Sequence, residues 1–353
     1  MKPVKQINIL YRQNSFPLFQ NRLYDTPEEA MSCPTGDIEL VEDLKTGLIY
    51  NTHFQPDRVV YDAFYNNEQD LSLYFQKHLE QVAQLIEMHM GRQSLLEVGC
   101  GKGFFLEMLL SRGFDISGFD PTYEGTNKRI LKQYFAPGIM KPANGLILRH
   151  VLEHIPNPVD FLYQLKKANN NQGLIYIEVP CFDWICERRA WFDVFYEHVN
   201  YFRLTDFDRI FSQVIESGRI FRGQYLYIIA SLCSIREPVI NHNDRPQFPV
   251  NFMPIRAKFN TTAIWGGGSK GVIFSLLNAR AGKTVDIVID INPAKQGKYL
   301  PFSALQVSAP EQAMRTLKPG STIYVMNSNY LNEIQKLTCN KYKLIGIDNE
   351  YLS

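Results

Sequence analysis

The stretch LLEVGCGKGFFL, residues 95–106, decides the fold of this chain. An apolar run ends at three glycines spaced two apart, Gly99, Gly101 and Gly103, and an apolar periodic segment follows them. This pattern predicts a strand, a tight turn and a helix. Glycine adopts positive φ without steric cost, and the amides that begin a helix favour negative groups. We therefore expect the three glycines to cradle a ligand.

Two acidic residues make this expectation more specific. Glu97 stands on the predicted strand just before the glycines, and Asp120, followed by Pro121, ends the next apolar segment. A carboxylate at the tip of a second parallel strand lies beside the first loop, where it can accept both hydroxyls of a ribose. The glycine spacing differs from the G-x-G-x-x-G of NAD-binding loops, and it favours S-adenosylmethionine (SAM).

Further motifs extend the pattern along the chain. They are GFDPTYEG, LILRHVLEHIPNP (146–158), YIEVP (176–180) and FYEHVNYF (195–202). With the glycine loop, they resemble the class I SAM-dependent methyltransferases. Together with WGGGSKG and KQGKYLP near the C-terminus, they are similar to the three-domain C-methyltransferases that act on nucleotide-linked deoxysugars. The resemblance covers most of the chain and implies SAM as the cofactor.

The order of the expected elements predicts an α/β protein with a seven-stranded, doubly wound, Rossmann-like core. The strands of this core are expected near 94–98, 115–119, 145–149, 173–179, 217–222 and 225–232. The last two strands should form a hairpin and close the sheet with an antiparallel strand. Three domains are expected: a small N-terminal domain (1–78), a SAM-binding core (79–235) and a second Rossmann-like domain (236–353).

Two helices can be placed from their periodicity. Apolar residues at helical spacing predict a helix over 71–90, with His78 and His89 as surface or cap histidines. The stretch RLTDFDRIFSQV predicts a second helix with Thr205 as its N-cap.

Composition limits the kinds of partner. The 353 residues carry a formal net charge of +1, and 45% of them are hydrophobic. Because the chain has almost no net positive charge, neither nucleic acid nor an anionic membrane is an expected partner. No apolar run is long enough to span a bilayer. We expect a cytoplasmic monomer or homodimer with a small-molecule substrate. The six cysteines follow no framework spacing, so reduced thiols are expected.

The resemblance also implies two CxxC pairs that hold a structural zinc in the N-terminal domain. The corresponding positions here are Leu10, Gln13, Asp43 and Thr46, and only Cys33 and His53 lie nearby in the sequence. Because zinc needs thiolate or imidazole ligands, we expect this domain to fold without zinc, through apolar packing. Methyl transfer from SAM requires no metal either, so no metal site is expected anywhere in the chain.

Besides Gly99, Gly101, Gly103 and Pro121, which are expected to bind the cofactor, four charged side chains are expected around it. Glu97 and Asp120 should hold the methionine and ribose ends of SAM. Arg149 and His150 follow the next apolar strand of the core and should line the same crevice, at the carboxyl ends of the sheet. Glu153 and His154 rank lower, because they can cap the following helix or pair within it.

The general base is expected in FYEHVNYF. His198 is the candidate base, since imidazole titrates near neutrality, and Glu197 and Tyr196 are its candidate helpers. Similar family members carry Tyr-His-Glu-His where this chain has Phe195, Tyr196, Glu197 and His198. The preceding loop, CFDWICERRAWFDV, suits a lid over the sheet edge. The alternative is that Glu197 and His198 form a structural pair.

The leading hypothesis is a SAM-dependent enzyme that C-methylates a nucleotide-activated keto-deoxysugar. O- or N-methylation of another small molecule and a non-catalytic nucleotide-binding protein are the alternatives. The C-terminal glycines 266–268 could hold a nucleotide diphosphate with Lys270 nearby, or they could only allow close packing of helix on strand. A dehydrogenase that binds NAD at this loop is disfavoured, because the loop is not expected to match the G-x-G-x-x-G spacing of NAD-binding proteins.

Overall fold

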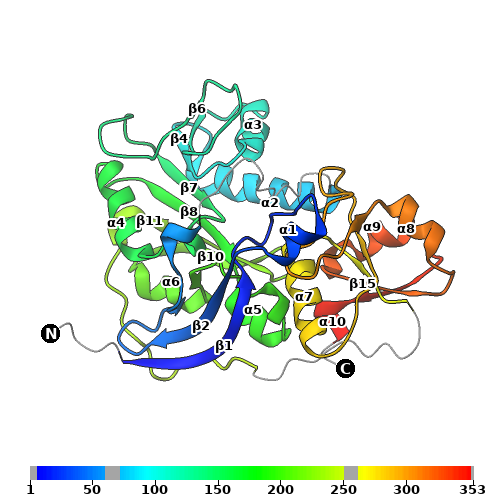
Figure 1. Cartoon of the computed structure of the whole chain (residues 1–353). Helices are drawn as coiled ribbons and strands as arrows, with labels where there is room; N and C mark the ends of the chain where they lie inside the picture. Colours follow the sequence, from blue (N-terminus) through cyan, green and yellow to red (C-terminus); the bar gives the residue numbers. More distant parts are fainter. Residues whose placement is uncertain (1–5, 60–71, 250–260, 351–353) are drawn as a thin grey trace.

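The described residues form three β-sheets (Figure 1). The structure, a computed structural model, describes residues 6–59, 72–249 and 261–350. The strand orders are β1-β2-β3-β9 in a four-stranded sheet, β10-β11-β8-β7-β4-β5-β6 in a seven-stranded sheet and β14-β13-β12-β15-β16 in a five-stranded sheet. The predicted α/β class is confirmed, whereas the predicted domain boundaries stay a prediction.

The seven-stranded sheet is the core that the glycine stretch predicted. Its strands are β4 (Leu95–Val98), β5 (Ile116–Phe119), β6 (Ile130–Leu131), β7 (Gly145–Arg149), β8 (Leu174–Pro180), β10 (Val214–Ile220) and β11 (Tyr225–Ser231). Strand β11 runs antiparallel to both of its neighbours, and the remaining pairs are parallel. The predicted hairpin and closing strand are therefore confirmed. The two-residue strand β6 was not predicted, because so short a pairing leaves no periodic signal.

The described residues also form ten α-helices. They are α1 (Pro27–Met31), α2 (Leu73–Met90), α3 (Phe104–Ser111), α4 (Pro158–Ala168), α5 (Phe182–Glu187), α6 (Leu204–Ile210), α7 (Ser269–Arg280), α8 (Pro310–Thr316), α9 (Leu331–Leu337) and α10 (Ile347–Glu350). Short 3-10 turns include η1 (Pro56–Arg58), η2 (Leu152–His154), η3 (Trp191–Asp193), η4 (Leu232–Ser234) and η5 (Ser328–Tyr330). No helix among the described residues is long and apolar enough to cross a membrane.

Two details of the predicted helices are wrong. His78 of α2 is buried, not a surface residue, because it lies on the same face as the core residues Leu79 and Val82. Helix α6 has Arg203 at its N-cap position, with the Arg203 amide donating to Asp206 Oδ2 at 2.7 Å. Thr205 therefore lies inside the helix and does not cap it.

The N-terminal sheet packs against the core through apolar side chains. It contains β1 (Ile7–Pro17), β2 (Thr35–Asp43), β3 (Ile49–Asn51) and β9 (Asn200–Tyr201). Phe16, Ile38 and Leu40 are fully buried in the main hydrophobic cluster. Strand β9 comes from the stretch that carries His198, so this distant segment is part of the N-terminal sheet.

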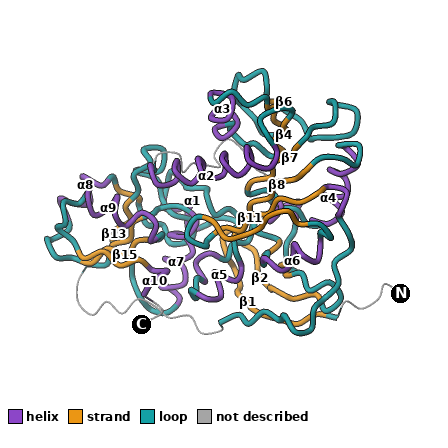
Figure 2. The backbone as a smooth tube through the Cα atoms, turned by 180° about the vertical axis from the view of Figure 1, so that it is seen from behind, coloured by secondary structure: helices purple, strands orange, loops and turns teal. Residues whose placement is uncertain are grey.

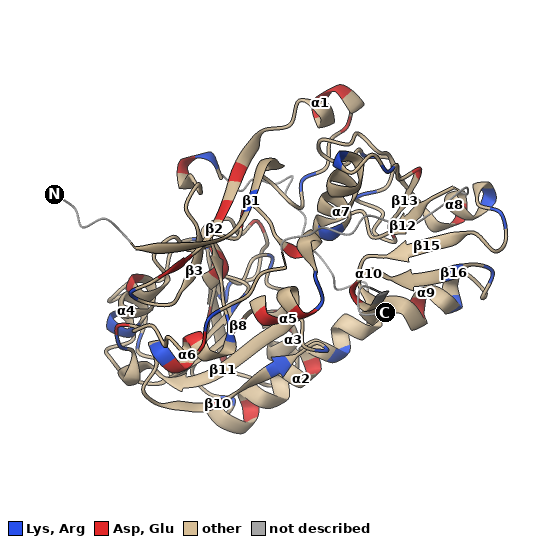
Figure 3. Cartoon of the chain, turned by 90° about the horizontal axis from the view of Figure 1, so that it is seen from below, with Lys and Arg blue, Asp and Glu red and all other residues tan. Residues whose placement is uncertain are grey.

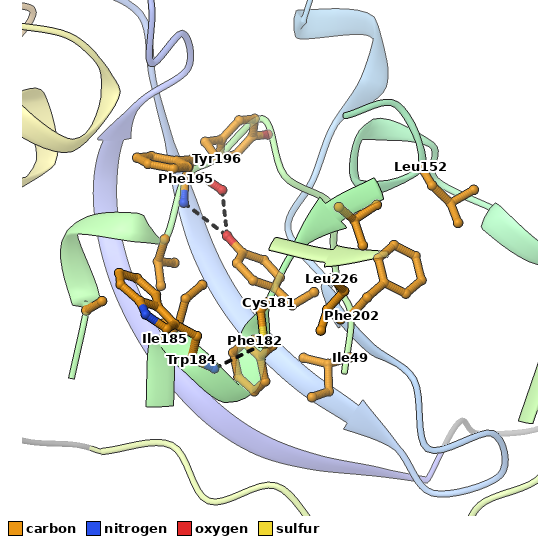
Figure 4. Close-up of a cluster of buried hydrophobic side chains, with 14 of the residues drawn as sticks. Ile49, Leu152, Cys181, Phe182, Trp184, Ile185, Phe195, Tyr196, Phe202 and Leu226 are labelled. Atoms are coloured by element: carbon orange, nitrogen blue, oxygen red, sulfur yellow. Dashed lines mark hydrogen bonds between the residues drawn. The ribbon is translucent and has the colours of Figure 1, made fainter. Parts of the chain in front are cut away.

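The segment predicted as a lid is part of the core instead. Residues 181–194 form α5 and η3, and Trp191, Phe192 and Val194 are at most 1% exposed. Figure 4 shows Phe182 and Trp184 packed among other buried side chains of this cluster. The aromatic residues that suggested a cover over a cleft are therefore packing residues.

The C-terminal sheet repeats the parallel plan of the core. Its strands are β12 (Ala263–Trp265), β13 (Ile287–Ile289), β14 (Val307–Ser308), β15 (Thr322–Val325) and β16 (Lys343–Gly346). Figure 2 shows these strands with α8 and α9 at one end of the molecule, beside α2. The positions of basic and acidic residues alternate along the ribbon in Figure 3, in keeping with the near-zero net charge. All six cysteines are free.

Candidate active site

Asp120 accepts hydrogen bonds from the Gly99–Gly103 loop and from the residues after β5. Gly99, Gly101 and Gly103 all have positive φ, between +55° and +84°. The Gly101 amide donates to Asp120 Oδ2 at 2.8 Å, and the Thr122 amide donates to Asp120 Oδ1 at 2.8 Å. Helix α3 begins directly after the loop. The structure thus brings these residues together as expected, with Asp120 and Pro121 at the end of β5.

Glu97, on the strand before this loop, is buried, and one of its carboxylate oxygens accepts no hydrogen bond from the described residues. It is 3% exposed, and among the described residues its Oε2 has no hydrogen-bond partner. Burial raises the pKa of Glu97 to about 8, although the Arg149 charge acts in the opposite direction. A buried acceptor without a donor is unfavourable by roughly 1–3 kcal/mol. The position therefore suits a ligand that brings a donor or a positive charge.

Glu178 of β8 connects Arg149 and His150, and the sequence analysis did not identify it. Its Oε1 lies 3.2 Å from Arg149 Nη2, 3.1 Å from His150 Nε2 and 3.0 Å from His78 Nε2. Tyr176 donates to Glu178 Oε2 at 2.7 Å. Burial acts to raise the pKa of Glu178, but the Arg149 and His78 charges hold this pKa well below its usual value. The sequence feature that could have identified Glu178 is its position as the single charged residue in the apolar strand YIEVP.

His150 links this carboxylate to the residues that follow β7. Its φ is +53°, an uncommon backbone conformation for a residue other than glycine. His150 Nδ1 lies 3.4 Å from Glu153 Oε1. Burial alone would lower the pKa of His150, but the hydrogen bonds to Glu153 and Glu178 raise it to about 9. With this pKa, His150 is mainly protonated at neutral pH.

His198 lies beside His154, a residue that the sequence analysis ranked low. The two imidazole centroids are 4.9 Å apart, and Glu153, His154 and His198 each place one nitrogen or oxygen within 4.8 Å of the others. Val151, which precedes them, would clash with a Cβ on Gly99 at 2.5 Å, so this turn packs on the cofactor loop. Burial, with repulsion from His154 and His150, holds the pKa of His198 well below its usual value. His198 is thus neutral, with a lone pair on one ring nitrogen.

Glu197 and Tyr196 contact the N-terminal segment. Glu197 is fully buried, and its Oε1 accepts from the Gln20 amide at 2.5 Å. The Tyr196 hydroxyl accepts from the Gln55 amide at 3.0 Å and donates to the His53 carbonyl at 3.1 Å. These contacts favour positioning roles for both residues, and their predicted catalytic roles stay predictions. Gln20 Nε2 also lies 3.4 Å from His198 Nε2, a contact that nothing in the sequence indicated.

A second glycine loop borders a cavity of about 180 Å³ in the C-terminal part. The Gly267 amide donates to Asp290 Oδ2 at 2.8 Å and the Asn292 amide to Asp290 Oδ1 at 2.8 Å, which repeats the arrangement around Asp120. Lys295 and Asn292 line the cavity, and among the described residues the buried Asn292 Nδ2 has no hydrogen-bond partner.

Lys270 lies near this loop as expected: it lines the cavity, and its amine pairs with Asp193 Oδ2 at 2.8 Å. A second amine, Lys295 Nζ, lies 2.9 Å from a Cβ built on Gly268 and 3.7 Å from Asp290 Oδ2. One expectation for this loop needs correction. Gly266, Gly268 and Gly271 do stand at G-x-G-x-x-G spacing, so our argument against a dinucleotide loop was wrong. A Cβ on Gly271 would meet the Gly266 carbonyl at 2.0 Å, which explains the third glycine by close packing.

The chain was compared with models of known protein families. Residues 66–214 match a family model described as a methyltransferase domain. No curated protein sequence matches the chain.

Solved structures with a similar arrangement include three bacterial methyltransferases. The 1,6-didemethyltoxoflavin-N1-methyltransferase of Burkholderia thailandensis is 14% identical, with 44% of this chain and 77% of that chain covered and a TM-score of 0.35. A SAM-dependent methyltransferase from Aquifex aeolicus is 16% identical, with 44% and 89% covered and a TM-score of 0.33. The magnesium protoporphyrin IX methyltransferase of Synechocystis PCC 6803 is 14% identical, with 50% and 91% covered and a TM-score of 0.36. At these scores the likeness carries no argument about the acceptor.

The matched range contains the glycine loop, Asp120 and Glu97. The match also decides between an enzyme and the non-catalytic protein that the sequence left open. The protein is an enzyme with a methyltransferase domain over residues 66–214, and its cofactor is S-adenosyl-L-methionine.

Proposed function

We propose that this enzyme methylates the sugar of a nucleotide-activated sugar, at a carbon next to a keto group, with His198 as the proton acceptor. The observation that supports this proposal is that two consecutive residues, Gln20 and Asn21, contact two different sites. Gln20 contacts His198 and Glu197, and Asn21 lines the cavity beside the C-terminal glycine loop. Because Gln20 and Asn21 are consecutive, the same short segment contacts His198 and borders the cavity, and in this proposal the acceptor bridges the two.

The cofactor occupies the loop after β4 in this proposal. Asp120 accepts from the ribose hydroxyls while its bonds to the loop keep it oriented. Glu97 receives the ammonium group at the methionine end, which supplies the donor that its Oε2 lacks among the described residues. Arg149 and His150, held by Glu178, line the same crevice, and Pro121 follows Asp120 at its edge.

The nucleotide occupies the C-terminal cavity. The loop amides and the start of the twelve-residue helix α7 suit a diphosphate, with Lys295 supplying a positive charge. Asn292 Nδ2 supplies a further donor. The three predicted domains, 1–78, 79–235 and 236–353, then have distinct tasks, since the first contributes Gln20 and Asn21 between the other two.

Methyl transfer needs alignment and the removal of one proton. His198 takes the proton from the carbon beside the keto group, the resulting enolate carbon bonds to the methyl, and the sulfur–carbon bond breaks with its electron pair on sulfur. S-adenosylhomocysteine (SAH) is the by-product. Glu197 holds His198 against the N-terminal segment.

The test measures SAH formation by the full chain with SAM and a panel of nucleotide-linked keto-deoxysugars. We expect turnover with a nucleotide-linked sugar and a carbon-bound methyl in the NMR spectrum of the product. Lys295→Ala should raise KM for this acceptor about 10- to 100-fold, as expected for one charge-assisted hydrogen bond, with little change in kcat. Lys298→Ala, which removes an amine paired with Asp25 at 3.2 Å, is the matched control. Equal turnover on the free sugar, or an unchanged KM in Lys295→Ala, would contradict the proposal.

A further inference from the structure

The cluster formed by Glu153, His154 and His198 has the composition of a metal site. One ligand atom from each residue lies within 4.8 Å of the other two, and this group is the metal-ligating cluster found among the described residues. Glu153 and His198 are 2% and 6% exposed. We propose that these three side chains bind a divalent transition-metal ion that activates the methyl acceptor.

The hydrogen bonding of His154 fixes which of its nitrogens can bind an ion. His154 Nδ1 lies 3.0 Å from the Glu197 carbonyl oxygen, and because a carbonyl only accepts, Nδ1 carries the proton. In the neutral ring, Nε2 then has a lone pair. Metal-bound histidines commonly donate their other N–H to a carbonyl or carboxylate in this way, which orients the ring. The Glu197 carbonyl is thus a support for this ligand.

Two buried oxygens beside the imidazoles have no donor among the described residues. They are Oε2 of Glu153 and Oε1 of Gln20, whose Nε2 lies 3.4 Å from His198 Nε2. The other oxygen of Glu153, Oε1, faces His150 Nδ1 at 3.4 Å. Glu153 can therefore keep its pairing with His150 while Oε2 binds an ion. A buried carboxylate oxygen next to two imidazoles indicates an electropositive group that the described side chains do not supply.

Two imidazoles and one carboxylate are the ligands of several catalytic metal sites with open positions. Imidazole ligands favour Zn²⁺ or Co²⁺ over Mg²⁺ and Mn²⁺, which prefer oxygen ligands. Bonds of about 2.0–2.1 Å place tetrahedral ligands about 3.4 Å apart. The present span of up to 4.8 Å thus requires a small side-chain rotation to close on the ion. Three protein ligands leave room for water and for an acceptor oxygen.

This inference rests on the proposed function for its location and specifies how the acceptor is activated. With the ion bound, His198 is a ligand, and a metal-bound hydroxide takes the acceptor proton in its place and leaves as water. The ion holds the negative oxygen of the enolate while its carbon bonds to the methyl, and the sulfur keeps the electron pair of the broken bond. Ions of this kind lower the pKa of bound water towards neutrality.

Cobalt uptake by the chelator-treated full chain tests the proposal without substrate. We expect one Co²⁺ per chain, with visible absorption bands of a nitrogen- and oxygen-bound ion, and competition by Zn²⁺. Glu153→Gln and His198→Ala should each weaken this binding by about 100-fold or more, since even supporting residues change metal affinity about 10- to 100-fold. The exposed-residue variants Glu187→Gln and His242→Ala are the matched controls. Thermal unfolding of each variant shows whether it is folded.

Equal Co²⁺ uptake by the wild-type protein and a folded Glu153→Gln variant would overturn the metal site. Full SAH formation after complete chelation would also overturn it, while leaving His198 as a free base under the proposed function. Conversely, specific Co²⁺ binding without turnover on any nucleotide-linked sugar would retain the metal site and refute the acceptor.

Discussion

Replacing His198 with alanine is expected to lower kcat by about 10²- to 10⁴-fold, the range for loss of a general acid or base. Both proposed forms of activation need an imidazole nitrogen with a lone pair, either as a proton acceptor or as a metal ligand. The buried ring has this lone pair at neutral pH because burial and the neighbouring histidines lower its pKa. The measurement is single-turnover methyl transfer, which separates chemistry from binding.

The affinity of His198→Ala for SAM should be unchanged, because the hydrogen-bond and ring contacts of His198 among the described residues are with Gln20, His154, Phe195 and Tyr201, outside the Gly99–Gly103 loop. His242→Ala removes an exposed imidazole and provides the control. Turnover at the wild-type rate would refute the role of His198. Loss of turnover together with loss of SAM binding would indicate a structural role instead.

Replacing Glu178 with glutamine should lower the free energy of unfolding by about 3–5 kcal/mol, the range for breaking a buried ion pair. The carboxylate is fully buried, and its removal leaves the Arg149 guanidinium and the His150 imidazolium without their shared partner. Urea unfolding at neutral pH measures the change. Glu187→Gln breaks an exposed pair with Arg219 at 2.8 Å and should cost about 1 kcal/mol or less.

The stabilisation by Glu178 should also depend on pH. Because the folded-state pKa of Glu178 is well below the unfolded value, its contribution is present above about pH 4.5 and is lost as the pH falls further. The wild-type protein and the Glu178→Gln variant should therefore converge in stability in acid. A difference that is small at pH 7, or that grows in acid, would contradict the assignment of Glu178 as the central carboxylate.

The sequence allowed the geometry of the glycine loop to be predicted because this geometry is local. The loop, its glycines and Asp120 follow from strand–turn–helix spacing, and the structure joins them by two hydrogen bonds. The closing hairpin could be predicted for the same reason. Short strands such as β6 and β14 could not, because two residues give no periodicity.

The contacts around His198 and Glu178 could not be predicted because they span long distances in the chain. Gln20 meets His198 from 178 residues away, and His78 meets Glu178 across 100 residues. The aromatic loop before His198 was misinterpreted as a lid because its composition is the same whether the rings cover a ligand or pack in a core. Only the tertiary structure distinguishes these cases, through the burial of Trp191 and Phe192.

Calorimetric titration of the full chain with SAH, beside the Asp120→Asn variant, tests the central claim most directly. The account predicts binding at one site in the wild-type protein. It also predicts a dissociation constant about 10- to 100-fold higher in the variant, which loses the charge that holds the loop and the ribose. No binding of SAH or SAM by the folded wild-type protein at saturating concentrations would contradict it.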